Sequence, residues 1–97
     1  MSHEGENQKA IQEYLRDQFK GFEVTERPEY PLYHWFTVTI LKPPAQQSEQ
    51  YKLRVAWPKI SDNNNSPEKI ARQLVLDDVA NRMRAKPQGE YFSWGLG

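Results

Sequence analysis

Two runs of residues between Leu32 and Trp57 constrain the fold more than any other part of the chain. The first runs from Leu32 to Lys42 and the second from Tyr51 to Trp57. Both are rich in β-branched and aromatic residues that alternate with polar ones. A period of two is typical of a strand with one buried and one exposed face. We therefore interpret the runs as two antiparallel strands of a hairpin, joined by a loop from Pro43 to Gln50.

The hairpin is flanked by two segments with helical periodicity. Between Asn7 and Lys20 the apolar residues form a single stripe, and Gly21 is a suitable C-cap. The second helix is predicted from Pro67 to about Ala85, directly after Ser66, which is a favourable N-cap. Apolar residues cover most of this second helix, which is typical of a helix that is well buried or that shows a second face to a partner.

The order of these elements predicts an α+β fold. A short strand from Phe22 to Arg27 precedes the hairpin, so the order is helix, strand, strand, strand, helix. We expect a three-stranded antiparallel sheet with both helices on one face, because an antiparallel sheet needs only one covered face. Residues 1–6 are expected to be a flexible N-terminus, 7–86 a single domain and 87–97 an aromatic C-terminal tail.

The same periodicities predict which residues fill the core. From the strands these are Phe22, Val24, Phe36, Val38, Ile40, Leu53, Val55 and Trp57, and from the helices Ile11, Leu15, Phe19, Ile70, Leu74, Val75 and Val79.

Composition narrows the classes to which the protein can belong. With 97 residues the chain fits one domain, and its zero formal net charge provides no global field for attracting nucleic acid or an anionic membrane. The absence of Cys excludes disulfides and thiolate chemistry. No apolar run approaches the ~20 residues of a membrane span, and the acidic first residues do not resemble a signal peptide. We therefore expect a cytoplasmic location and no membrane contact.

The residues best suited to chemistry do not form a catalytic or metal-binding pattern. His34 has no sequence neighbour spaced to be its catalytic partner or a fellow metal ligand, so we interpret it as a structural or surface histidine. Asp77 and Asp78 are adjacent on the predicted helix and point about 100° apart, so they cannot act together on one substrate. We expect no catalytic residue, no metal and no cofactor, and hence a protein that is not an enzyme.

A basic and aromatic group is predicted on the sheet face that points away from the helices. Trp35, Lys52 and Arg54 share this face with two threonines, and residues 27–59 carry five Lys or Arg against two Glu. Basic groups beside an aromatic ring suit single-stranded nucleic acid and equally suit an acidic protein surface. An ordinary solvated face with cross-strand pairs remains the alternative.

The aromatic tail offers a second candidate surface. Tyr91, Phe92 and Trp94 follow Pro87 and Gly89 in a short segment. These rings either fold back onto the domain or dock on a partner, since aromatic residues are enriched among interface anchors.

The order of elements resembles that of the double-stranded-RNA-binding domain over roughly residues 7–85. That family opens its last helix with Lys-Lys-x-Ala-Lys, and the corresponding residues here are Glu68-Lys69-Ile70-Ala71-Arg72, which match two of the three basic positions. The family also has Gly-Pro-x-His between its first two strands, whereas the segment Pro31-Leu32-Tyr33-His34 has no Gly and places Pro and His one position further apart. The resemblance implies that duplex RNA would contact Lys69 and Arg72, together with Arg27 and His34.

These observations lead to two functional hypotheses. The first is a small non-catalytic binding module that acts as an adaptor or regulator through protein-protein contacts. The second is an RNA- or DNA-binding domain. A protein partner is expected under the first and nucleic acid under the second, and a homodimer is left open.

Overall fold

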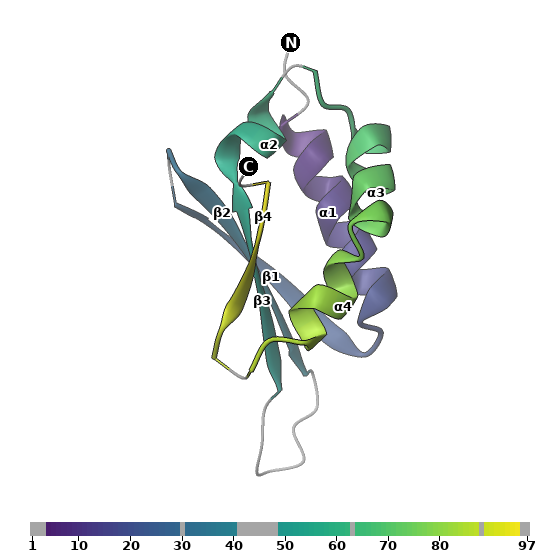
Figure 1. The fold of residues 1–97 in the computed structure, drawn as a ribbon, viewed down its shortest axis with the longest axis vertical. Coiled ribbons are helices and arrows are strands. Elements are labelled where there is room, and N and C mark those ends of the chain that lie inside the picture. The colour runs from purple at the N-terminus through teal and green to yellow at the C-terminus, as the bar shows by residue number, and fades with distance from the viewer. Residues whose placement is uncertain (1–3, 30, 41–48, 63, 88, 96–97) are drawn as a thin grey trace.

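A four-stranded sheet, with helices packed on one of its faces, makes up the computed structural model of the chain (Figure 1). The structure describes residues 4–29, 31–40, 49–62, 64–87 and 89–95. The elements in chain order are α1 (Glu4–Gln18), β1 (Phe22–Glu29), β2 (Tyr33–Ile40), β3 (Gln50–Ala56), α2 (Trp57–Ser61), α3 (Pro67–Leu76), α4 (Val79–Arg84) and β4 (Tyr91–Trp94).

The sheet is mixed and has the strand order β1-β2-β3-β4. The first three strands are antiparallel neighbours, as predicted, whereas β4 pairs with β3 in parallel. The α+β class is confirmed, but the prediction of a three-stranded antiparallel sheet is wrong. Residues of the expected tail add the fourth strand, and the helices between β3 and β4 form the crossover that a parallel pair requires.

The last helix is broken in two, which the sequence reading did not predict. Asp77 caps the end of α3, and Asp78 then takes a left-handed conformation with φ of 53° before α4 begins. Asp tolerates this conformation better than most residues. The Asp78 carboxylate accepts a hydrogen bond from the Asn81 amide at 2.9 Å, and the Ala80 backbone N–H donates to the Tyr14 hydroxyl at 3.1 Å. The Tyr14 bond satisfies one of the free N–H groups at the start of α4.

Two further boundaries differ from expectation. Helix α1 begins at Glu4, so part of the expected flexible N-terminus is helical, and residues 1–3 lie outside the described residues. Strand β3 ends at Ala56, and the expected strand end and loop instead form α2, with Pro58 in its first turn, where proline is well tolerated. The buried Asn7 side chain donates from Nδ2 to the Ile60 carbonyl at 2.9 Å, which ties α1 to α2.

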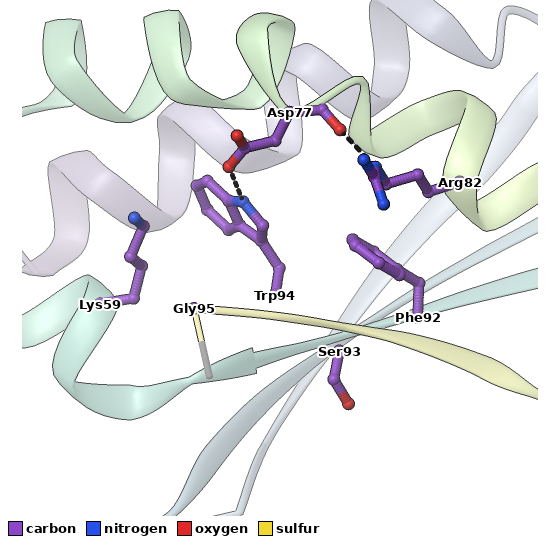
Figure 2. Close-up of a pocket in the computed structure, with 7 residues that line it drawn as sticks. All are labelled: Lys59, Asp77, Arg82, Phe92, Ser93, Trp94 and Gly95. Atoms are coloured by element: carbon purple, nitrogen blue, oxygen red, sulfur yellow. Dashed lines mark hydrogen bonds between the residues drawn. The ribbon is translucent and has the colours of Figure 1, made fainter. Parts of the chain in front are cut away.

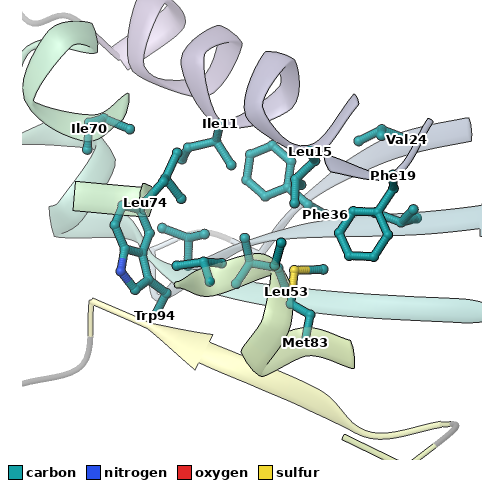
Figure 3. Packing of buried hydrophobic residues seen from close by; sticks show 14 of the residues in the cluster. Ile11, Leu15, Phe19, Val24, Phe36, Leu53, Ile70, Leu74, Met83 and Trp94 are labelled. Carbon is teal, nitrogen blue, oxygen red and sulfur yellow. The ribbon is translucent and has the colours of Figure 1, made fainter. Parts of the chain in front are cut away.

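The core lies between the helices and the sheet (Figure 3). Most predicted core residues are buried or packed against the buried cluster, but Val75 is 66% exposed, because the buried stripe of α3 runs through Ile70 and Leu74. The side chain of Ile40 and most of the predicted loop from Pro43 to Gln50 lie outside the described residues. Unpredicted members of the buried cluster are Ile60, Ala80, Met83 and Trp94.

The strand register is tested by two neighbouring substitutions on β3. Leu53 is fully buried, whereas Lys52 points to the opposite face. Leu53→Ala should lower the free energy of unfolding by roughly 2–5 kcal/mol, as for a buried leucine. Lys52→Ala should change it by about 0.5 kcal/mol or less. Urea denaturation of both variants measures the difference, and a larger effect at Lys52 would show that the register is inverted.

The helix break is tested at Asp78. Val and Gly substitutions both remove the hydrogen bond with Asn81. The difference in unfolding free energy between the two variants therefore reports on the backbone conformation. Because φ is positive, Asp78→Gly should be more stable than Asp78→Val by about 1 kcal/mol. Thermal and urea unfolding provide the measurement. In a continuous helix Val would be the better residue, so the reverse order would contradict the break.

Candidate binding surface on the open sheet face

The sheet face opposite the helices collects the basic and aromatic residues of the two central strands. The register places Trp35 opposite Arg54 and Thr37 opposite Lys52. Because directly opposed residues in an antiparallel pair share a face, the structure brings the predicted Trp35, Lys52 and Arg54 together. Tyr33 also belongs to this face, since it lies two residues before Trp35 on β2.

Strand β4 completes the surface. It places Tyr91 beside Lys52 and Ser93 beside Arg54. The Tyr91 ring meets the Trp35 ring edge to face, with centroids 5.0 Å apart. This is a favoured arrangement for aromatic pairs. The sequence did not predict this contact, because Tyr91 reaches the face only through a strand pairing of four residues.

Arg54 is the centre of the group. Its guanidinium carbon lies 4.1 Å from the ring centroid of Tyr33 and 4.6 Å from that of Tyr91. Its Nε donates a hydrogen bond to the Ser93 hydroxyl at 3.0 Å. The side chain is therefore held in place by three neighbours from two other strands. We call the residues Arg27, Tyr33, Trp35, Lys52, Arg54 and Tyr91 the open-face cluster.

Four residues of the cluster line a hollow, and the cluster as a whole carries an excess of positive charge. The hollow has a volume of about 380 Å³, and Arg27, Trp35, Lys52 and Tyr91 line it. Glu29 accepts a hydrogen bond from the Trp35 indole at 3.2 Å and lies 4.0 Å from the Arg27 guanidinium. In the described part of the chain, Lys52 and Arg54 have no carboxylate within ion-pair distance. The hollow can therefore accept an acidic or planar group.

The residues implied by the RNA-binding resemblance are not brought together. Lys69 and Arg72 lie on α3, on the helix side of the sheet, and the Lys69 ammonium donates to the Asn64 carbonyl at 3.0 Å. Arg27 lies on the open face, opposite Trp35. His34 is only 4% exposed and faces the core, where its Nε2 lies 2.9 Å from the Glu26 carboxylate. The four side chains thus occupy three separate places.

The three tail aromatics divide between the two faces of the sheet. Tyr91 is exposed on the open face, whereas Phe92 is half-buried and packs against the core cluster. Trp94 is 4% exposed, and its indole donates to the Asp77 carboxylate at 2.8 Å. Of the two alternatives for the tail, Phe92 and Trp94 therefore follow the one in which the rings fold back onto the domain, whereas Tyr91 stays exposed.

Other kinds of site find no support among the residues that the structure describes. They contain no group of three or more His, Cys, Asp or Glu placed to hold a metal ion. None of the described helices has the length and hydrophobicity needed to cross a membrane.

The role of Arg54 in fastening β4 can be measured. Arg54→Lys keeps the charge but loses the planar contact with two rings and the Nε bond to Ser93. Backbone amides of residues 91–94 should exchange hydrogen about three to ten times faster, consistent with a loss of ~1 kcal/mol. Lys52→Gln on the same face serves as the control and should leave exchange in β4 nearly unchanged. Unaltered exchange in Arg54→Lys would show that Arg54 does not hold the strand.

Comparisons with models of protein families, with curated proteins and with solved structures found no match for this chain. Fold class alone does not imply function. Any assignment of function therefore rests on the side chains that the structure brings together.

Proposed function

We propose that the protein is a small non-catalytic binding module that acts as an adaptor or regulator, and that a partner protein docks on the open-face cluster. The observation that carries this proposal is the convergence of Trp35, Arg54 and Tyr91 on a sheet face that no described helix covers. Trp, Tyr and Arg are the residue types enriched at energetic centres of protein interfaces. Their mutual contacts hold them in place before binding, which lowers the entropy lost on association.

The charges around the cluster favour an acidic protein surface as the partner. Lys52 and Arg54 can pair with carboxylates, while Thr37 and the Trp35 ring provide neutral contacts. A nucleic-acid strand suits the face less well. Nucleic acid presents a continuous row of phosphates, whereas the open-face cluster has three cations, of which Arg27 already lies 4.0 Å from the Glu29 carboxylate. The zero net charge of the chain also gives no long-range attraction for a polyanion.

The proposal is tested by affinity capture from a lysate of the cells that express the protein. Wild type is compared with Trp35→Ala and Lys52→Glu on the open face, and with Lys9→Glu, a charge reversal on exposed α1. Each capture is repeated after nuclease treatment, and the recovered proteins are quantified by mass spectrometry. We expect wild type and Lys9→Glu to capture an acidic partner protein, with or without nuclease treatment. Neither open-face variant should capture it.

The purified partner then provides a direct measurement. Calorimetry should show binding weakened about tenfold or more by Lys52→Glu, which is about 1.4 kcal/mol, and less than about twofold by Lys9→Glu. Equal affinity for all variants would show that the open face is not the docking surface. Recovery of RNA or DNA in place of a protein, lost on the Lys52 change, would favour the nucleic-acid function instead.

A further inference from the structure

The two edges of the sheet differ in how well they are protected against another strand. Strand β1 contains Pro28 and four charged residues, and both features are common protections of an edge. Strand β4, at the other edge, reads Tyr-Phe-Ser-Trp and has neither a proline nor a charge. Among the described residues, no further strand pairs with the outer N–H and C=O groups of β4. The β4 edge is therefore the one open to strand addition.

A pocket of about 400 Å³ lies beside this edge, on the helix side of the sheet (Figure 2). Phe92 and Trp94 of β4 form one wall of the pocket, and Lys59 of α2 and Arg82 of α4 stand at its two ends. Side chains alternate along a strand, so a peptide paired with β4 would direct every second side chain to the helix side of the sheet, where this pocket lies.

The pocket offers two cations against one carboxylate, so its lining carries a net positive charge. The Lys59 ammonium lies 4.8 Å from the ring centroid of Trp94, and the Arg82 Nε donates to the Asp77 carbonyl at 2.8 Å. The Asp77 carboxylate accepts the Trp94 indole N–H at 2.8 Å. Among the described residues, neither Lys59 nor Arg82 has a carboxylate within ion-pair distance.

We propose that the β4 edge binds an extended acidic peptide segment of another protein by strand addition. The peptide backbone pairs with the free groups of β4, and one Asp or Glu side chain enters the pocket between Lys59 and Arg82. Backbone pairing supplies affinity in such complexes, and the pocket supplies selectivity.

A second copy of the chain is a poorer occupant of this edge. Strand β4 carries no acidic residue, so its self-pairing would bring no carboxylate from within the strand to Lys59 or Arg82. The nearest acidic residue, Glu90, precedes the strand, and its backbone N–H is held in a turn by the Pro87 carbonyl at 3.0 Å. The charges therefore favour a peptide from a different protein.

The probe for this site is a displayed library of random octapeptides, selected on the whole wild-type protein. Selected sequences should be enriched in Asp or Glu at one position between alternating apolar residues. Fluorescence anisotropy then compares a labelled selected peptide with the same peptide carrying Lys at the acidic position. Addition of the acidic peptide should slow hydrogen exchange at the amides of residues 91–94.

Variants locate the contact. Peptide binding should weaken about tenfold or more in Lys59→Gln and in the double variant Lys59→Gln/Arg82→Gln. The single variant keeps the Arg82 bond to Asp77. The matched control is Lys9→Gln/Lys20→Gln, which removes two charges from exposed positions outside both the β4 edge and the open-face cluster and should change affinity less than about twofold. Because none of these variants alters the open-face cluster, a loss of peptide binding here is distinct from a failure of the proposed function.

Three results would overturn the proposal. One is a set of selected peptides that is not enriched in Asp or Glu at any position. A second is a selected peptide that binds the double variant as tightly as it binds wild type. The third is a concentration-dependent dimer in analytical ultracentrifugation that the peptide dissociates, since this would assign the β4 edge to a second copy.

Discussion

The hydrogen bond from the Trp94 indole to the Asp77 carboxylate joins the last strand to the break in the last helix. A buried tryptophan needs a partner for its N–H, and Asp77 can supply one because α3 ends there. The left-handed Asp78 then redirects the chain so that α4 packs against β3 and β4. A straight helix through these residues would leave the sheet without this cover. The helix break and the fourth strand are therefore one structural feature that two aspartates and one tryptophan bring about.

The same strand determines which side chains lie together on the two faces of the sheet. Alternation along β4 sends Tyr91 and Ser93 to the open face and Phe92 and Trp94 to the helix side. Without Tyr91 and Ser93, the Arg54 guanidinium would keep only the Tyr33 and Trp35 rings as its neighbours among the residues it contacts here. Without Phe92 and Trp94, Lys59 and Arg82 would lie on an open surface. The four residues of β4 thus bring charged side chains from other elements together with aromatic rings on both faces of the sheet.

The sequence was sufficient where a periodicity persists over a whole element. Alternation through Leu53 and Val55 identified both the buried face and the shared face of Trp35, Lys52 and Arg54. It was insufficient where one residue overrides the pattern. Asp77 and Asp78 lie within an apolar periodicity that predicts one helix. The break is accompanied by one long-range hydrogen bond, from Trp94 to Asp77, and by local bonds from Asn81 and Arg82. The pairing of β4 was not predictable either. Alternation over only four residues does not show which strand of the sheet they pair with.

The shared strand has a thermodynamic consequence for the two proposed surfaces. A short edge strand belongs to the parts of a fold that open most readily, because few backbone bonds hold it. A peptide paired with the outer edge of β4 stabilises the closed strand, and the closed strand is the state in which Tyr91 reaches Trp35 and Arg54. Binding at the edge would then strengthen binding at the open face, and linkage requires the reverse effect to be equally large. Two partners bound at the two proposed surfaces would therefore favour each other without touching.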